Sequence, residues 1–232
     1  MQIFYTPDIA IKPELPEEEA GHCIRVLRLG EGDEIVLTDG QGSFYKAAIS
    51  RAHPKHCEVT LLESWKQPDL WNVNLHIAIA PTKNMDRMEW FVEKATEIGI
   101  NAITCLNCRF SERKEIKPIR LEKILVSAMK QSQKATLPAL EGMTDFKKFV
   151  ATPFDGRKFI AHCEEGHNPR VKHTIQPGEN ALILIVPEGD FSPEEIKLAQ
   201  ENDFEPISLG ESRLRTETAA LVACHTIHVL NQ

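Results

Sequence analysis

The chain has 232 residues, of which 42% are hydrophobic and 26% charged, and its formal net charge is −7. This composition is that of a globular protein with a core, and it excludes a largely disordered chain and nucleic-acid binding through bulk positive charge. The longest aliphatic run, Ala181 to Val186, is far shorter than the roughly 20 residues of a membrane helix, and the N-terminal residues lack the pattern of a signal peptide. We therefore expect a cytoplasmic protein without a membrane segment.

The N-terminal part of the sequence predicts a small β-barrel. Four short segments are rich in β-branched or aromatic residues and are expected to be strands: Met1 to Tyr5, Glu34 to Leu37, Phe44 to Ser50 and Cys57 to Ser64. A helix is expected to begin at Pro16, where three glutamates suit a helix N-terminus, and to end near Gly30. Lys66 to Leu70 has the composition of a linker, so we predict domains at residues 1–68 and 72–232.

From Val73 onward, strand and helix patterns alternate, which is typical of a mostly parallel sheet with helices on both faces. The helices are expected over an apolar stripe from Met88 to Ile98 that ends at Gly99, from Pro118, from a capping box at Ser192 to Glu195, and at the C-terminus. The expected strands are Leu75 to Ala80, Ala102 to Leu106, Arg157 to Cys163, Ala181 to Val186 and Glu205 to Leu209. Between two of these strands, Glu164 to Asn180 is a polar loop too long to be a mere connection.

Two glycine-containing loops indicate a ligand site. Pro187 to Phe191 and Ser208 to Thr216 each follow a strand, and we expect the two strands to be neighbours, with both loops at their carboxyl ends. Gly189 and Gly210 allow close approach to a ligand or a positive φ. Because no phosphate-binding glycine motif is present, we expect a ligand that is not held through phosphates.

The sequences of these two loops, IVPEGDFS and SLGESRLRTETA, resemble the closing motifs of the small-subunit ribosomal RNA methyltransferase E family. Two further blocks agree: Lys83 to Gly99, and the first helix with its His22, Val26-Leu27-Arg28 and Gly32. The resemblance implies a PUA-like β-barrel followed by an α/β SPOUT methyltransferase domain with a trefoil knot. It also implies a homodimer that uses S-adenosyl-L-methionine to methylate N3 of a uridine in the 16S rRNA of the small ribosomal subunit.

The resemblance assigns cofactor-binding residues by position. These are Val186, Glu188, Gly189, Ser208, Leu209, Gly210, Leu214, Thr216 and Thr218. Backbone groups there are expected to bind the adenine, with apolar side chains beside it. The chain departs from the family at Val186 and Asp190, where glycine is common, and at Ser212, where many members have a basic residue. The first two departures concern the shape of the loop around Glu188.

Methyl transfer to uridine N3 requires loss of a weakly acidic proton, and a guanidinium beside the uracil carbonyls would stabilise the resulting anion. We expect Arg215 in this role, with Glu217 and Thr216 positioning it and Arg213 as the weaker candidate. The catalytic residues predicted here are therefore Arg215 and Glu217. An ordinary ion pair of Arg215 with Glu217 or Glu211 is the alternative. The proton acceptor stays open between water and a group of a partner subunit.

RNA contacts are expected from two regions. His22, Arg25 and Arg28 lie on the predicted first helix, and the family resemblance makes that helix an RNA-binding face. Between Arg109 and Lys134 there are eight basic and three acidic residues, including Arg113 and Lys130, which we expect to contact phosphates.

Cys105 and Cys108 form a lone C-x-x-C without a second pair, so we expect small buried residues and no metal site.

A non-enzymatic RNA-binding assembly factor with the same fold is the alternative function, and Val186 and Asp190 would be its signature. A nucleotide-using α/β enzyme is disfavoured by the missing phosphate loops.

Overall fold

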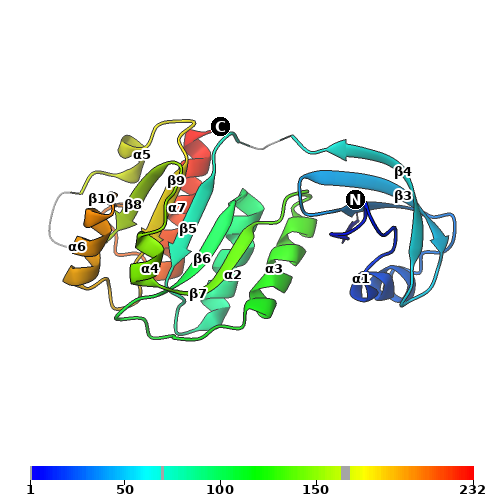
Figure 1. Ribbon diagram of the computed structural model, residues 1–232, viewed down its shortest axis with the longest axis horizontal. Helices are drawn as coiled ribbons and strands as arrows, with labels where there is room; N and C mark the ends of the chain where they lie inside the picture. Colours follow the sequence, from blue (N-terminus) through cyan, green and yellow to red (C-terminus); the bar gives the residue numbers. More distant parts are fainter. Residues whose placement is uncertain (1, 69–70, 163–167) are drawn as a thin grey trace. The chain divides into compact units, whose positions relative to one another are not determined.

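The computed structural model describes residues 2–68, 71–162 and 168–232 (Figure 1). It divides into two compact units, one formed by Met1–Asp69 with Val126–Leu137 and the other by Leu70–Leu125 with Pro138–Gln232. The domain boundaries expected from the sequence, residues 1–68 and 72–232, remain a prediction. The compact units add that Val126–Leu137 is grouped with the N-terminal residues.

The first unit contains a four-stranded sheet in the order β1-β2-β3-β4. Its strands are β1 (Ile3–Tyr5), β2 (Glu34–Thr38), β3 (Ser43–Arg51) and β4 (Glu58–Lys66). β1 pairs with β2 in parallel, and the other pairs are antiparallel. Fully buried Phe4, Leu37 and Ala47 contribute to its core. All four predicted strands are confirmed, although Met1 lies outside the described residues.

The predicted first helix is shorter than expected and changes its geometry. α1 (Glu17–Gly21) begins after Pro16, and a π-helical turn η1 (His22–Val26) follows it directly. Arg28 then has a φ of 58°, a left-handed conformation that ends any helix before Gly30. Single π-turns are frequent at functional sites, and this one contains two of the predicted RNA-binding residues, His22 and Arg25.

Val126–Leu137 contacts the turn between β2 and β3. The carbonyl of Ala135 accepts hydrogen bonds from the Gly42 N–H at 2.9 Å and from the Thr38 hydroxyl at 3.1 Å. The Leu137 N–H donates to the Gly40 carbonyl at 2.9 Å. These bonds satisfy the backbone of the predicted hairpin turn with groups almost a hundred residues away, which sequence periodicity cannot indicate.

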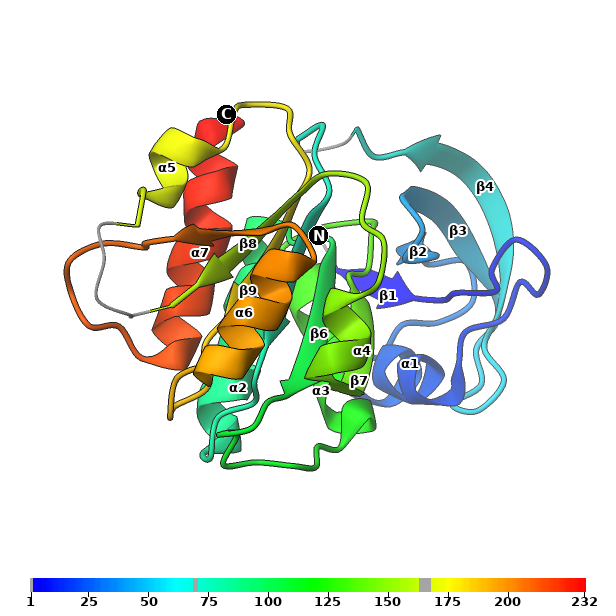
Figure 2. The same cartoon turned by 60° about the vertical axis from the view of Figure 1, so that its left-hand side comes forward.

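The second unit is built on a six-stranded sheet in the order β10-β8-β9-β5-β6-β7, in which every pair is parallel (Figures 1 and 2). Its strands are β5 (Leu75–Ile79), β6 (Ala102–Asn107), β7 (Ala139–Asp145), β8 (Arg157–Ala161), β9 (Ala181–Ile185) and β10 (Phe204–Ile207). Five of these six strands were predicted from the sequence. The predicted end of one of them, Cys163, lies outside the described residues. β7 was not predicted because this edge strand contains no buried residue and so lacks an apolar run.

Helices cover both faces of this sheet, with α4 and α6 on one face and α2 and α7 on the other (Figure 2). The remaining helices of the chain are α2 (Met85–Ile98), α3 (Pro118–Gln131), α4 (Phe146–Val150), α5 (Val171–Thr174), α6 (Pro193–Glu201) and α7 (Thr216–Leu230), and the part of α3 from Val126 onward belongs to the first unit. The predicted capping box of α6 is present, with Ser192 and Glu195 bonding reciprocally. None of the helices in the described ranges combines the length and apolar composition that crossing a membrane requires.

The strand order corrects one prediction. β9 and β10, which precede the two glycine-containing loops, are not neighbours because β8 lies between them. Since all the strands are parallel, the two loops still leave the same edge of the sheet. The correction arises because the order of parallel strands depends on crossover connections, not on order along the chain.

Gly156→Ala is expected to destabilise the protein by about 2–3 kcal/mol. Gly156 has a φ of 155°, and a Cβ there would lie 2.5 Å from the Asn180 Cβ and 2.6 Å from its carbonyl oxygen. Gly178→Ala is the matched control, because Gly178 has a φ of 84° but nothing within 4 Å of a Cβ. It should cost only about 1 kcal/mol of backbone strain. Equal urea midpoints for the two variants would contradict the close contact at Gly156.

Candidate functional site

A cavity of about 870 Å³ opens at the carboxyl ends of β8, β9 and β10. Its volume lies in the range of sites for cofactor-sized ligands. Five of the nine predicted cofactor-binding residues line it: Val186, Ser208, Leu209, Gly210 and Leu214. Ala161, Ile185, Ile207 and Ala219 add apolar surface, while His162, Arg170 and Asp190 add polar groups. Further polar side chains in the lining are Asn168, Glu211, Ser212 and Arg213, the weaker of the two predicted catalytic arginines, so the cavity combines an apolar wall with a polar one.

Gly210 gives the β10–α7 loop its shape. Its φ is 140°, a backbone conformation that other residues rarely adopt, and a Cβ there would meet nothing within 4 Å. The Gly210 N–H donates to the Ser208 hydroxyl at 3.2 Å, which closes a short local turn. The expectation of a positive φ at Gly210 is therefore confirmed, and the space beside it belongs to the cavity.

The β9–α6 loop accommodates the two departures from glycine. Asp190 has a φ of 65°, and its carboxylate accepts the N–H of Phe191 at 2.8 Å. Aspartate is among the few residues that tolerate this left-handed conformation. Val186 lines the cavity without a positive φ. Neither position therefore requires glycine in this chain.

Gly189 has a steric role in the same loop. A Cβ at Gly189 would lie 3.0 Å from the Cβ of Phe110 and 3.3 Å from its carbonyl oxygen. The β9–α6 loop therefore packs directly against the segment that follows β6. Gly189 itself does not line the cavity, so the structure associates it with loop packing.

Three other residues predicted to bind the cofactor lie outside the cavity lining. Glu188 accepts a hydrogen bond from the Lys83 N–H at 3.0 Å. Thr216 is buried at the start of α7. Thr218 lines a separate hollow of about 340 Å³ together with Asp86, Arg87, Trp90 and Glu217. Their assignment as cofactor ligands stays a prediction.

Arg215 is exposed and directly precedes α7. Within the described part of the chain its side chain makes no hydrogen bond or ion pair. The acidic neighbours have other partners, because Glu211 pairs with Arg170 at 2.7 Å and Glu217 lies 3.8 Å from Arg87. The ordinary ion pair considered for Arg215 is thus not formed, and neither is the expected support of Arg215 by the Glu217 carboxylate.

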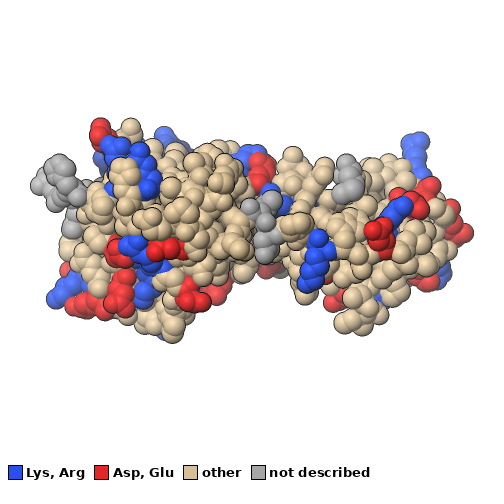
Figure 3. All heavy atoms as spheres, turned by 90° about the horizontal axis from the view of Figure 1, so that it is seen from above, with Lys and Arg blue, Asp and Glu red and all other residues tan. Residues whose placement is uncertain are grey.

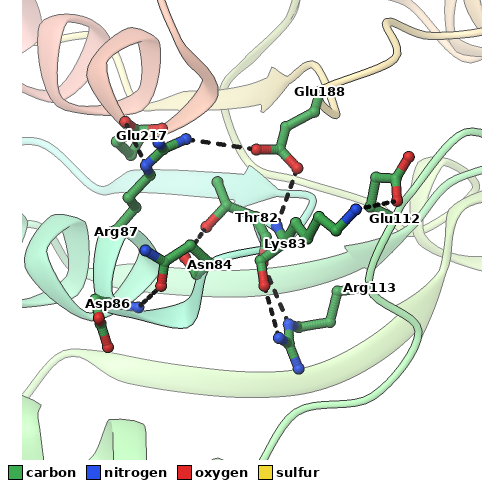
Figure 4. A network of polar contacts seen from close by, with 9 residues as sticks. All are labelled: Thr82, Lys83, Asn84, Asp86, Arg87, Glu112, Arg113, Glu188 and Glu217. Carbon is green, nitrogen blue, oxygen red and sulfur yellow. Dashed lines mark hydrogen bonds and ion pairs between the residues drawn. The ribbon is translucent and has the colours of Figure 1, made fainter.

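Arg87, which the sequence analysis did not single out, is at the centre of a polar network (Figure 4). Its guanidinium lies between Glu188 of the β9–α6 loop, at 3.7 Å, and Glu217 of α7, at 3.8 Å. The Asn84 side chain caps α2 by accepting the Asp86 N–H at 3.0 Å, which places Arg87 in the first helical turn. The available signal was its position inside the block Lys83 to Gly99.

The predicted RNA-binding residues differ in their availability. Arg25 and Arg28 are exposed around the π-turn, whereas His22 is partly buried and bonds Gln2 at 3.5 Å. Arg113 donates to the backbone carbonyls of Thr82 and Lys83 at 3.2 and 2.7 Å. Lys130 pairs with Glu19 at 2.6 Å. Arg113 and Lys130 therefore have protein partners, and basic and acidic side chains intermingle on the face drawn in Figure 3.

The C-x-x-C pair is buried in the second unit, as expected. Cys105 is 0% and Cys108 2% exposed. Burial raises the pKa of each thiol to about 12. Metal binding and nucleophilic chemistry both need thiolates, so this environment suits structural cysteines. Among the described residues, no group of three or more His, Cys, Asp or Glu side chains could hold a metal ion.

Comparison with known proteins identifies the family to which the chain belongs. A model of the RNA methyltransferase domain matches residues 69–228, and a model of the RNA methyltransferase PUA domain matches residues 15–62. The ribosomal RNA small subunit methyltransferase E of Synechocystis is 30% identical, over 89% of this chain and 69% of that protein. The chain belongs to this methyltransferase family. It is therefore an RNA methyltransferase, and the enzyme class expected from the sequence is confirmed.

Solved structures agree with this membership along the whole chain. A structure described as "probable rRNA-methyltransferase" from Porphyromonas gingivalis is 45% identical and has a TM-score of 0.94, covering 100% of this chain and 98% of that one. A structure from Legionella pneumophila described as a "putative methyltransferase" with bound SAM is 28% identical and has a TM-score of 0.87, covering 99% of this chain and 97% of that one. The predicted fold class, a PUA-like domain before an α/β SPOUT domain, is confirmed, while the trefoil knot stays a prediction.

Cys105 and Cys108 are expected to resist alkylation by iodoacetamide in the native protein at pH 8. With a pKa of about 12, roughly one thiol in ten thousand is ionised at that pH, and both thiols are buried. Peptide mass spectrometry after native and urea-denatured labelling measures this directly. Rapid native modification of either cysteine, at the rate of the denatured control, would contradict the buried environment.

Proposed function

We propose that the protein transfers a methyl group from S-adenosyl-L-methionine to N3 of a uridine in the 16S rRNA of the small ribosomal subunit. The observation that carries the proposal is the cavity of about 870 Å³ at the carboxyl ends of β8, β9 and β10, in a chain of the RNA methyltransferase family. The relatives are named as methyltransferases of the small-subunit ribosomal RNA, which supports 16S rRNA as the substrate. The SAM bound in the Legionella structure supports S-adenosylmethionine as the cofactor.

The cavity suits the cofactor in chemistry as well as in volume. Val186, Leu209 and Leu214 offer apolar surface for a flat adenine, and the backbone at Leu209 and Gly210 offers groups for its polar edge. The chain lacks a glycine-rich phosphate loop, and this cofactor has no phosphate to bind. Neither Val186 nor Asp190 closes the cavity, which removes the feature that had favoured a non-enzymatic assembly factor.

Bound S-adenosylmethionine supplies a methyl group that is already electrophilic, so the protein must align N3 and stabilise negative charge on the uracil. Arg215 is suited to this role because its guanidinium is exposed beside the cavity loop and unpaired among the described residues. Paired N–H donors on a uracil carbonyl would stabilise the base after it loses the N3 proton. Glu217, paired with Arg87, contributes through the shape of the α7 start.

Recognition of RNA is assigned to the first unit. The PUA match covers η1, around which Arg25 and Arg28 are exposed, and His22 lies at its start. Such cations give affinity through phosphate contacts without reading sequence. Arg113 and Lys130 contribute by holding their own segments, since both have protein partners. We also propose that the protein is a homodimer and that it acts in the cytoplasm, where its ribosomal RNA substrate is located.

Gly210→Val is expected to raise the Kd for S-adenosylmethionine at least about tenfold, equivalent to roughly 1.4 kcal/mol. The branched side chain would occupy space beside Gly210 that is open in the cavity. Gly178→Val is the control, since Gly178 also combines a positive φ with open surroundings but does not line the cavity. Isothermal titration should give wild-type affinity for the control. Similar affinities for both folded variants would locate the cofactor elsewhere.

Arg215→Ala is expected to lower kcat by about 100-fold or more, the typical cost of losing one group that stabilises developing charge. Its Kd for S-adenosylmethionine should stay within about threefold of wild type, because the side chain acts on the base. Formation of 3-methyluridine in 16S rRNA, measured by nucleoside mass spectrometry, reports turnover. Arg109→Ala removes an exposed arginine from the same unit as a control. Undiminished turnover would exclude Arg215 from catalysis.

A further inference from the structure

Two acidic side chains, one from a loop and one from a helix of the second unit, approach the same arginine (Figure 4). Glu188 belongs to the β9–α6 loop and Glu217 to the first turn of α7. Arg87, from the first turn of α2, lies 3.7 Å from Glu188 through its Nη1 and 3.8 Å from Glu217 through its Nε. One guanidinium on α2 thus contacts two segments that each lie more than a hundred residues further along the chain.

Glu217 depends on this cation more than Glu188 does. Its side chain is 10% exposed, and its Oε2 is buried without a hydrogen-bond partner in the described part of the chain. A buried carboxylate without a nearby positive charge is unfavourable, because burial removes the water that would otherwise stabilise it. Glu188 is more exposed, and its Oε2 also accepts the Lys83 N–H at 3.0 Å.

Hydrogen bonds fix the backbone of the turn from which the Arg87 side chain extends. The Asn84 side chain caps α2, and the Thr82 hydroxyl donates to the Asn84 carbonyl at 2.7 Å. Arg113 donates to the carbonyls of Thr82 and Lys83, which fixes the loop that leads into the helix. The guanidinium therefore projects from a constrained turn, so its position can constrain the two loops it contacts.

The two segments that Arg87 connects form two walls of the cavity. Val186 and Asp190 line it from the β9–α6 loop, while Leu214 and Ala219 line it from the chain around the α7 start. Arg87 itself is absent from the lining. Its influence on a bound cofactor would therefore pass through the two glutamates.

We infer that Arg87 is a positioning residue that holds the two walls of the cavity at the separation required for cofactor binding. This inference rests on the proposed function, because it concerns the same S-adenosylmethionine site. Without Arg87, the buried Glu217 carboxylate loses the cation that lies 3.8 Å from it, and the α7 start moves toward solvent. Removing the charge of Glu217 at the same time removes the cause of that movement.

The test is a double-mutant cycle on the full chain, with the Kd for S-adenosylmethionine measured by isothermal titration. We expect Arg87→Gln to raise the Kd about tenfold and Glu217→Gln to raise it about threefold or less. The double variant R87Q/E217Q should bind more tightly than R87Q alone. Arg109→Gln is the matched control, since it breaks an exposed pair with Glu194 at 3.0 Å and should leave the Kd within about twofold of wild type.

The outcomes separate this inference from the proposed function. A folded wild-type protein that does not bind S-adenosylmethionine overturns both. Wild-type binding with an unchanged Kd for R87Q, or a double variant equal to the product of the two single effects, overturns only the role of Arg87. Should R87Q not fold alone, Arg87→Lys replaces it, because lysine keeps the charge but lacks the fork that contacts both Glu188 and Glu217. An unchanged Kd for R87K then overturns the inference. Initial rates distinguish a positioning effect, which raises the KM for S-adenosylmethionine, from a loss of kcat.

Discussion

The parallel direction of all six strands in the second unit is the constraint on which the site depends. Parallel strands end at one edge of a sheet, so loops from distant parts of the sequence meet there. The segments after β5, β6, β8, β9 and β10 all leave this edge, and the cavity forms where the last three end. A single reversal of β9 or β10 would move its loop to the opposite edge.

Loops at a shared edge need cross-links, because each is joined to the sheet only at its ends. Arg113 fixes the β5–α2 loop through backbone carbonyls, and Glu188 bonds the same loop through the Lys83 N–H. Arg87 then connects Glu188 with Glu217. Charged residues in this network therefore act mainly on one another. Arg213 and Arg215, in the loop before α7, have no such contact in the described chain and are both available to a substrate.

The same distinction applies to the predicted RNA contacts. A count of basic residues between Arg109 and Lys134 identifies positive charge but does not show which charges are available. Arg113 bonds backbone carbonyls, Arg120 pairs with Glu89 and Lys130 pairs with Glu19. Arg25 and Arg28, by contrast, are exposed around the π-turn where the first helix ends. Whether a basic side chain is available to bind RNA therefore depends on whether it already has a protein partner, which the local sequence does not show.

By itself, the sequence determined the elements whose signals are local: the strands with continuous apolar runs, the stripe of α2, the capping box of α6 and the need for glycine at position 210. Its motifs also determined the family and five residues of the cavity. Only the tertiary structure decided the order β10-β8-β9, the edge strand β7, and the grouping of Val126–Leu137 with the first unit. It also decided that Glu217 contacts Arg87 instead of Arg215. The reason is physical: caps, turns and periodic burial depend on neighbours along the chain, whereas strand order and ion pairs depend on which distant segments share an edge.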